Sequence, residues 1–224
     1  MSKIILAHTE DGSYTLFNED INEHYHSIHG AVRESTHIFI NAGLMSMVGR
    51  NPEIRILEIG FGTGLNALLT LIEQQKLNIK VNYSALEPYP VPREIYEKLN
   101  YCNFLAVPIL NSSFELMHSN IDNNSVKINR DFTFNGYLTT FQKFESVDNN
   151  FDLIYLDAFS PDTEPALWTE DIFIKLHRIM NKEGVIVTYC SKGIVRRLMQ
   201  SCGFSTERLP GPPGKHEILR ATAL

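Results

Sequence analysis

The 224-residue sequence predicts an α/β fold in which helices cover an open, mostly parallel β-sheet. Short apolar runs of the kind that form buried parallel strands occur at residues 54–59, 81–86, 151–157 and 185–190. A helix-like pattern follows each of these runs, as expected where helices connect parallel strands. The chain ends in two further apolar segments joined by a turn rich in Pro and Gly, which predicts a terminal antiparallel hairpin.

Length and composition predict a single soluble globular unit. We divide it into a small N-terminal elaboration, residues 1–50, and a main domain, residues 51–224. No apolar run approaches the roughly 18 residues that span a membrane, and the N-terminus lacks the apolar region of a signal peptide. The three cysteines form no C-x-x-C pair, and their odd number argues against a disulfide framework. We therefore expect a cytoplasmic protein that does not enter membranes.

The charge of the chain is unevenly distributed. The net charge is −6, but residues 175–220 carry nine Lys and Arg against three Glu. A basic terminal segment on an acidic body can guide a polyanion to one face of the molecule. A solvated basic face without a partner is the alternative interpretation.

The first 50 residues predict a hairpin followed by a helix. Apolar segments 4–8 and 14–17 flank an Asp-Gly turn signal in a hairpin that spans residues 1–22, and residues 36–48 have an amphipathic helical pattern. Residues 23–37 contain four of the eight histidines, at spacings that match no set of metal ligands. We expect no metal there, and interpret the segment as the polar lining of a pocket or a solvated helix start. The apolar side of the helix carries Phe39, Ile40, Leu44 and Val48.

After the glycine-rich region, turn residues and hydrophobic periodicity predict the remaining helices and strands. Prolines at 88, 90 and 92 end the second strand, and residues 104–110 fit either a strand or a buried helical turn. The predicted helices are 65–75, whose Leu68, Leu69, Leu71 and Ile72 face the sheet, 93–100, 168–180 with a cap at 181–184, and 194–201. Paired strands are predicted at 126–129 with 132–144 and at 204–209 with 216–221, and a loop at 120–124.

A glycine-rich turn follows the first buried strand. It reads Glu58-x-Gly60-x-Gly62-x-Gly64, and a helix begins directly after it. Such a turn allows close approach of the backbone to a ligand, and the helix start offers free N–H groups. The stretch also satisfies the dinucleotide pattern G-x-G-x-x-G/A, with the acid Glu87 about 20 residues on. An S-adenosyl-L-methionine loop and a dinucleotide loop therefore both remain open, and in either case Glu87 would bind the ribose.

A second acid, Asp157, ends the strand at residues 151–157. In an open α/β sheet, ligands bind beyond the carboxyl ends of the strands. We therefore expect Glu87, Asp157 and the glycine loop to share one crevice. For Asp157, capping of the following turn is the alternative role.

Three sequence blocks together resemble one enzyme family. They are residues 58–66 around the glycine loop, residues 156–161 followed by 167–169 and Phe173, and residues 210–215. The segments 187–189 and 195–198 and the N-terminal stretch 26–44 fit the same pattern. Their order and spacing are similar to those of the tRNA 5-methylaminomethyl-2-thiouridine methyltransferases, known as the MnmC methyltransferase domain or stand-alone MnmD.

The resemblance implies a class I S-adenosyl-L-methionine-dependent methyltransferase sheet, which is Rossmann-like. It implies methyl transfer to the aminomethyl nitrogen of the wobble uridine of certain tRNAs. Bifunctional relatives add a flavin-dependent oxidase domain, which makes that aminomethyl group. Since the sequence ends at Leu224 without such a domain, we expect no flavin and dependence on a separate enzyme for the substrate.

The resemblance also implies roles for individual residues. Asp157 would be catalytic, because the amine must lose a proton and an adjacent carboxylate can hold and orient it. Tyr25 and Phe159 would form aromatic walls for an extruded base, although either could instead be a core residue. The implied cofactor contacts are Glu34, Glu58, Gly60, Phe61, Gly62, Thr63, Gly64, Asn66, Glu87 and Asp157. The implied tRNA contacts are Tyr25, Phe159, Ser160, Pro161, Lys192, Arg196, Arg197 and Lys215.

Two departures from the family pattern concern the adenine and the tail. Thr139-Thr140 stands where relatives tend to have Gly-Asp, and His216 stands where an arginine is common.

Three other functions remain open at this stage. They are a methyl- or aminopropyltransferase acting on a small amine, a non-catalytic RNA-binding protein on the same fold, and a nicotinamide-dependent oxidoreductase.

Overall fold

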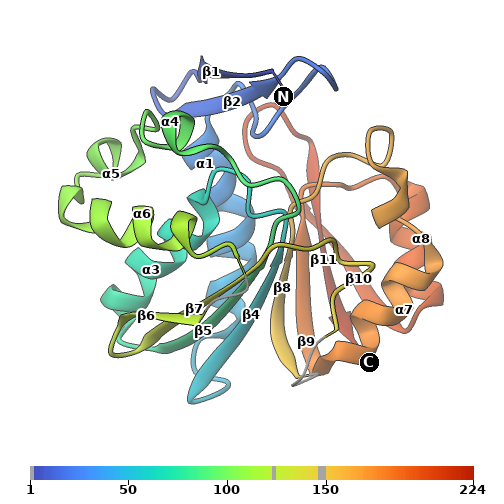
Figure 1. The fold of residues 1–224 in the computed structure, drawn as a ribbon. Coiled ribbons are helices and arrows are strands. Elements are labelled where there is room, and N and C mark those ends of the chain that lie inside the picture. The colour runs from blue at the N-terminus through green and yellow to red at the C-terminus, as the bar shows by residue number, and fades with distance from the viewer. Residues whose placement is uncertain (1–2, 123–124, 146–149) are drawn as a thin grey trace.

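An eight-stranded sheet forms the centre of the computed structural model, which describes residues 3–122, 125–145 and 150–224 (Figure 1). The five inner strands β9, β8, β4, β5 and β7 run parallel, whereas β11 and β6 are antiparallel to their neighbours. This arrangement confirms the predicted α/β fold with a terminal antiparallel hairpin. From edge to edge the strands are β10 (Phe204–Pro210), β11 (Glu217–Ala223), β9 (Met180–Thr188), β8 (Phe151–Leu156), β4 (Glu53–Ile59), β5 (Lys80–Leu86), β7 (Phe132–Tyr137) and β6 (Ser125–Asn129).

Helices cover both faces of the sheet and bury two hydrophobic clusters (Figure 1). Successive residues of a strand point to opposite faces, so Ile56 of β4 packs in one cluster and Leu57 in the other. The first face is covered by α1 (Ala31–Ser35), η1 (Thr36–Leu44), α2 (Met45–Met47), α3 (Leu65–Leu77) and α6 (Asn111–Ser119), and the second by α7 (Glu170–Ile179) and α8 (Gly193–Ser201). Short helical turns occur at α4 (Arg93–Tyr96), α5 (Tyr101–Phe104), η2 (Pro108–Leu110) and η3 (Pro165–Leu167).

A small N-terminal sheet lies above the central one, at the top of Figure 1. It consists of β1 (Ile4–His8), β2 (Tyr14–Asn18) and β3 (Glu23–His24). Leu16 of β2 packs with Val91 and Tyr96, so this sheet rests on the segment that follows β5. The predicted hairpin is confirmed over the described residues, and β3 was not predicted.

The first helical segment differs from the prediction in its start and its geometry. It begins at Ala31 rather than residue 36, and Thr36–Leu44 forms a π-helix. Phe39, Ile40 and Leu44 are buried as predicted, but Val48 is exposed because the helix ends before it. Segment 31–47 packs into the first hydrophobic cluster and so forms part of the layer on the sheet.

Several other predicted boundaries were wrong. The strand predicted at 132–144 ends at Tyr137, because the chain then turns inward and buries Phe141 and Phe144 in the second cluster. The helix predicted at 168–180 ends at Ile179, and Met180 begins β9 directly by pairing with Phe151 instead of preceding a cap. The helix predicted at 93–100 is reduced to α4.

The segment between β5 and β6 is helical. The ambiguous residues 104–110 contribute to α5 and η2, and the unpredicted helix α6 follows, with Phe114, Met117 and His118 buried. Residues 123–124 of the predicted loop 120–124 lie outside the described residues, as do residues 1–2 of the hairpin. In the described part of the chain, no helix has the length and apolar character needed to cross a membrane.

Candidate functional site

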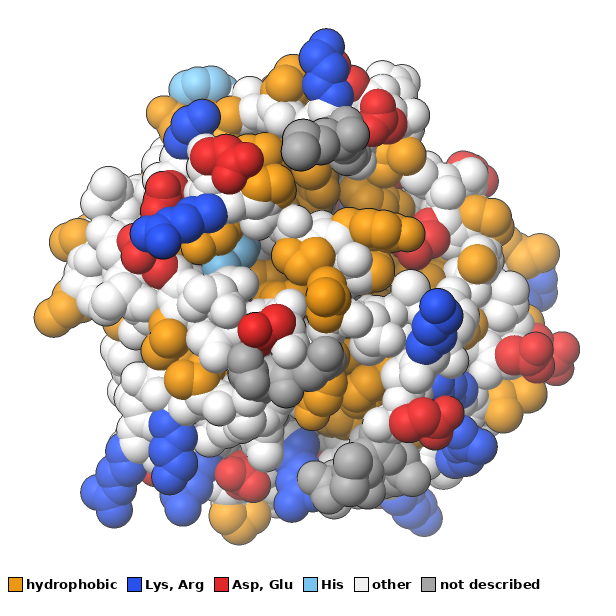
Figure 2. Space-filling model, in the orientation of Figure 1, with side chains coloured by type: hydrophobic (Ala, Val, Ile, Leu, Met, Phe, Trp, Pro, Cys, Tyr) orange, Lys and Arg blue, Asp and Glu red, His pale blue; other side chains and the backbone are white. Residues whose placement is uncertain are grey.

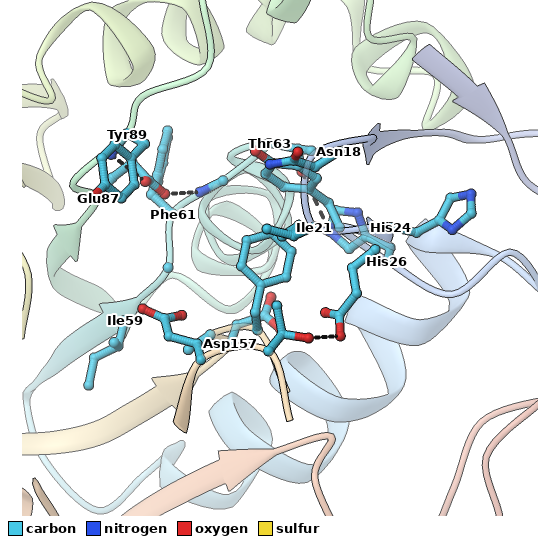
Figure 3. Close-up of a pocket in the computed structure, with 18 of the residues that line it drawn as sticks. Asn18, Ile21, His24, His26, Ile59, Phe61, Thr63, Glu87, Tyr89 and Asp157 are labelled. Carbon is cyan, nitrogen blue, oxygen red and sulfur yellow. Dashed lines mark hydrogen bonds between the residues drawn. The ribbon is translucent and has the colours of Figure 1, made fainter. Parts of the chain in front are cut away.

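A cleft of about 1530 Å³ lies beyond the carboxyl ends of β4, β5 and β8, below the N-terminal sheet. Figure 2 shows a hollow with hydrophobic side chains near the middle of this face. Figure 3 shows Glu87 and Asp157, which follow two different strands, around the same pocket as Phe61, Thr63 and His26. The predicted crevice shared by the glycine loop and two strand-end acids is therefore present in the structure.

The glycine loop is fixed by the neighbouring strands. The backbone N–H groups of Gly60 and Phe61 both donate to the carbonyl oxygen of Leu86, at 3.1 and 3.2 Å. Gly60 has a φ of +92°, and a Cβ there would lie 2.6 Å from the carbonyl oxygen of Asp157. A residue with a side chain would therefore be both strained and in collision, which explains the glycine. The loop leads into α3, whose N-terminus faces the cleft side of the sheet.

Glu87 is a buried acid held by backbone donors. Its two carboxylate oxygens accept hydrogen bonds from the backbone N–H of Gly62 at 2.8 Å and of Tyr89 at 2.9 Å. Burial raises the pKa of Glu87, while these two hydrogen bonds oppose the shift. The carboxylate is therefore fixed in orientation and can still accept hydrogen bonds from the hydroxyl groups of a ligand in the cleft.

Asn66 connects two acids behind the glycine loop. Its side-chain nitrogen donates to Glu58 at 2.9 Å and to Asp157 at 2.8 Å. Glu58 is fully buried and also accepts a hydrogen bond from the Tyr83 hydroxyl at 2.9 Å. This burial raises the pKa of Glu58 well above its usual range. The side-chain oxygen of Asn66 is buried and has no hydrogen-bond partner within the described residues.

Asp157 is a cleft acid whose pKa lies near neutral pH. Burial raises its pKa to about 7, and the nearby charge of Glu34 acts in the same direction. The hydrogen bond from Asn66 and the charge of Lys215 oppose this shift. An acid with a pKa near neutral pH can accept and release a proton under physiological conditions.

Lys215 and Glu34 form an ion pair on one side of the cleft. The Lys215 ammonium nitrogen lies 3.3 Å from Oε1 of Glu34 and 4.8 Å from the ring centroid of Tyr189. Oε2 of Glu34 accepts the backbone N–H of Ser27 at 2.7 Å. Lys215 thus lies beside Glu34 and Asp157, whereas the sequence placed it with the basic tail.

Aromatic and polar contacts join the N-terminal sheet to the loop after β8. The rings of Tyr25 and Phe159 meet edge to face, with centroids 5.4 Å apart. The Ser160 hydroxyl donates to Glu23 at 3.0 Å, and the Thr163 hydroxyl donates to the same carboxylate. The loop itself is fixed by Trp168, whose indole N–H donates to the Phe159 carbonyl at 2.9 Å. Tyr25, Phe159 and Ser160 all line the cleft.

The structure does not bring all predicted site residues into the cleft. Glu58, Gly64, Asn66 and Pro161 lie behind or beside its lining, and Lys192, Arg196 and Arg197 belong to the start of α8 outside it. Lys192 is paired with Asp162, and Arg197 is exposed. Glu34, Gly60, Phe61, Gly62, Thr63, Glu87, Asp157 and Lys215 line the cleft as described.

Sequence reasoning assigned no role to three lining residues, Glu23, Glu164 and Tyr189. Tyr189 follows β9 directly, so its position at a strand end was a usable signal. Its hydroxyl donates to the Ala158 carbonyl at 2.9 Å and so fixes the chain after Asp157. Glu23 belongs to the two-residue strand β3 and Glu164 precedes η3, and no sequence pattern marks either residue.

The histidine-rich segment contributes a buried neutral side chain. His26 lies 3.0 Å from the Thr15 hydroxyl, and burial lowers its pKa to about 4. No group of three or more His, Cys, Asp or Glu in the described part of the chain is arranged to hold a metal ion.

Comparison with known proteins gives consistent matches. A family model described as S-adenosyl-L-methionine-dependent methyltransferase matches residues 115–223. The tRNA 5-methylaminomethyl-2-thiouridine biosynthesis bifunctional protein MnmC of Pseudomonas fluorescens is 29% identical over 211 residues, which cover 89% of this chain and 32% of that protein. MnmC of Campylobacter fetus is 30% identical over 181 residues, covering 75% and 28%. The chain thus spans about a third of the length of these curated relatives.

Solved structures show the same fold. The crystal structure of MNMC2 from Aquifex aeolicus matches with a TM-score of 0.78 and 24% identity, over 100% of this chain and 71% of that one. Spermidine synthase from Thermotoga maritima matches with a TM-score of 0.58 and 12% identity, over 100% and 69%. These likenesses support the predicted class I methyltransferase architecture.

Proposed function

We propose that this chain, which belongs to the S-adenosyl-L-methionine-dependent methyltransferases of the MnmC and MnmD family, methylates the aminomethyl nitrogen of 5-aminomethyl-(2-thio)uridine at the tRNA wobble position. The product would be 5-methylaminomethyl-(2-thio)uridine. The observation that carries the proposal is the Asp157 carboxyl, which shares one cleft with the glycine loop and Glu87 and has a pKa near 7. The name of the MnmC relatives supports the tRNA substrate.

The cleft fits the cofactor in the chemistry of its donor groups. The fixed carboxylate of Glu87 suits ribose hydroxyls, and the loop backbone at Gly60 and Gly62 borders the cleft, where a Cβ on Gly62 would lie 3.1 Å from the Tyr25 ring. The unpartnered side-chain oxygen of Asn66 is a further acceptor beside the loop. Bound there, S-adenosyl-L-methionine supplies a methyl group on a positively charged sulfur, which keeps the electron pair of the bond that breaks.

Asp157 would prepare and hold the attacking amine. A primary alkylamine has a pKa of about 10 by analogy with Lys, and its ammonium form has no lone pair. The Asp157 carboxylate would take the proton that this ammonium must lose, and its oxygen would then accept an N–H of the neutral amine and hold the nitrogen toward the methyl carbon, the alignment that this transfer requires. As the new N–C bond forms, the methyl–sulfur bond would break with its electron pair on sulfur, the nitrogen would become a secondary ammonium, and Asp157 would release its proton to solvent.

Tyr25 and Phe159 would support the uridine. Their rings meet edge to face, so they form an aromatic corner without a slot for a base between them. Enzymes that modify a base hold the extruded nucleotide against aromatic side chains. Phe159 follows Asp157 by two residues in the chain and lines the same cleft, so a base resting on its ring would bring its substituent close to the acid.

The start of α8 would bind the tRNA backbone. Lys192 and Arg197 are exposed there, in the segment with the excess of basic residues, and Arg196 is half-buried. Phosphate contacts by Lys and Arg supply most of the non-specific affinity for nucleic acids. Lys215 lies within the cleft and is paired with Glu34, so its contact with a phosphate remains a prediction from the sequence.

The reaction consumes a uridine that already carries an aminomethyl group. An enzyme activity that makes this group must therefore act before this protein does, and a tRNA substrate would place both in the cytoplasm. The proposed transfer needs neither a flavin nor a metal ion, since the residues described provide the acceptor for the proton.

Transfer to a small amine is a second candidate function, because the cleft is lined by several carboxylates that would suit a polycationic amine. The test that separates the two uses labelled S-adenosyl-L-methionine with either tRNA from cells that lack the methylaminomethyl group or a polyamine. We expect label only in the tRNA, and its loss with Asp157→Asn but not with Asp171→Asn, which changes an exposed acid on α7. Label in the polyamine alone would replace the tRNA proposal.

A further inference from the structure

The charges that line the cleft are strongly unequal. Among the described lining residues, seven are Asp or Glu, and Lys215 alone is Lys or Arg. Among these side chains, Lys215 is therefore the one with a permanent positive charge that can attract an anionic group of a ligand. The acids are Asp20, Glu23, Glu34, Glu87, Glu94, Asp157 and Glu164.

The loop that carries Lys215 is built rigidly. The backbone N–H of Gly211 donates to the His216 carbonyl at 3.0 Å, and that of Lys215 donates to the Pro212 carbonyl at 2.9 Å. The loop is docked on the N-terminal segment, since the His37 ring lies 2.7 Å from the Pro210 carbonyl oxygen. These contacts fix the backbone of the turn at Lys215, whose side chain lines the cleft.

The ammonium group of Lys215 and the carboxylate of Glu34 lie side by side in the cleft. Lys215 is 3.3 Å from Glu34, and both charges act on the pKa of Asp157, in opposite directions. The carbonyl oxygen of Asp157 in turn touches the glycine loop at Gly60. Asp157 therefore contacts the glycine loop, an expected cofactor contact, and lies near enough to the ion pair for both charges to act on its pKa. An ammonium group has three N–H donors, so Lys215 can pair with Glu34 and still bind a carboxylate.

We propose that Lys215 binds the α-carboxylate of S-adenosyl-L-methionine while Glu34 binds its α-ammonium group, so that the cleft selects this cofactor over its decarboxylated form. This inference rests on the cofactor in the proposed function and is independent of the tRNA substrate. An α-amino acid group carries one negative and one positive charge a few ångströms apart, which the Lys215–Glu34 pair complements. Without Lys215, the carboxylate would meet no Lys or Arg among the described residues that line the cleft.

The test measures binding by titration calorimetry in the absence of tRNA, with S-adenosylhomocysteine and its decarboxylated analogue as probes. We expect the wild-type protein to bind the carboxylated probe at least tenfold more tightly. Lys215→Met should lose at least tenfold in affinity for that probe and little for the analogue. Lys127→Met, which changes an exposed lysine on the edge strand β6, is the matched control and should change neither affinity.

Several results would overturn the inference. Equal affinity of the wild-type protein for both probes would overturn the inference. This measurement needs no variant, so it remains decisive even if Lys215→Met fails to fold. A loss of equal size for both probes in Lys215→Met would show that Lys215 only supports the cleft. Lys215→Arg keeps the charge and should keep the preference. If the protein prefers the carboxylated probe but transfers no methyl group to tRNA, the result counts against the proposed tRNA substrate alone. If it binds neither probe, the result counts against both the proposed function and this inference.

Discussion

The side-chain nitrogen of Asn66 lies 2.8 Å from a carboxylate oxygen of Asp157, so the first turn of α3 holds the acid at the end of β8. The same nitrogen donates to Glu58 at 2.9 Å. Asn66, which follows the glycine loop, thereby links Glu58 of β4 to Asp157, the acid proposed to receive the proton. The proposed cofactor loop and the proposed catalytic acid are consequently positioned as one unit.

This link predicts how the pH dependence of methyl transfer responds to a variant. The wild-type rate should rise with pH and level off above about pH 7, as Asp157 loses its proton. Asn66→Ala removes a donor that lowers the pKa of Asp157, so the midpoint should move to higher pH. Asn135→Ala is the control, because Asn135 bonds to Asn82 and the Tyr83 carbonyl on another part of the sheet. An unshifted midpoint in Asn66→Ala would argue against Asp157 as the titrating group.

The raised pKa of Asp157 also predicts a pH-dependent stability. The pKa is about 7 in the folded protein and about 4 in the unfolded chain, so the folded state binds the proton more tightly. Stability from this group is therefore lost as pH rises from about 4 to about 7. Asp157→Asn cannot ionise and still accepts the hydrogen bond from Asn66.

We compare the free energy of unfolding of Asp157→Asn with that of the wild type. The difference in favour of the variant should grow by about 1–2 kcal/mol between pH 5 and pH 8. This is less than the full pKa shift of Asp157 implies, because its side chain is half-buried. Urea denaturation at the two pH values measures it. Asp171→Asn, at an exposed position, should show a much smaller difference. Parallel curves for wild type and Asp157→Asn would refute the raised pKa.

Two glycines with similar φ angles allow a matched test of the proposed cofactor loop. Gly60 and Gly49 have φ values of +92° and +82°, so alanine at either costs roughly 1 kcal/mol of stability. Only at Gly60 would the new Cβ collide, 2.6 Å from the Asp157 carbonyl oxygen, whereas nothing lies within 4 Å at Gly49.

Gly60→Ala should therefore be less stable than Gly49→Ala by about 1–3 kcal/mol. It should also bind S-adenosylhomocysteine at least tenfold more weakly, while Gly49→Ala binds it like the wild type. Urea denaturation and calorimetry measure the two effects. If both variants bound the probe equally well, the loop would not be the cofactor site.

The basic start of α8 predicts a salt-dependent interaction with tRNA. Arg197 is exposed there, and loss of one phosphate contact should reduce the slope of log affinity against log salt concentration by about 0.7–0.9. Arg197→Ala should therefore bind tRNA more weakly at low salt and with this smaller slope, as measured by filter binding. Lys80→Ala, at the start of β5 and so at the opposite end of the sheet from the cleft, should keep the wild-type slope. An unchanged slope in Arg197→Ala would remove this residue from the interface.

The parts of the fold that the sequence predicted well depend on local patterns. The run that forms β4, the glycine loop and α3 lie within one continuous stretch, and Asp157 ends an equally clear apolar strand. Since parallel strands end at the same edge, Glu87 and Asp157 could be placed in one cleft before the structure was known.

What the sequence did not show depends on contacts between distant segments. The pairing of Lys215 with Glu34 joins residues far apart in the chain, and so does the contact of Glu23 with Ser160. No local periodicity encodes either contact. Lys215 also belongs to a basic segment, so its charge alone gave no sign that it lines an acidic cleft. Helix α6 has only a short buried face, Phe114, Met117 and His118, which tertiary packing determines.

The most direct test of the central claim is the mass of the wobble nucleoside after reaction. Three preparations of one tRNA, carrying aminomethyl, carboxymethylaminomethyl or no group on the wobble uridine, are incubated with the protein and S-adenosyl-L-methionine. Digestion and mass spectrometry should show one added methyl group on the aminomethyl nucleoside alone. Absence of that product, with protein shown to be folded and to bind S-adenosylhomocysteine, or methylation of a different nucleoside, would contradict the proposed function.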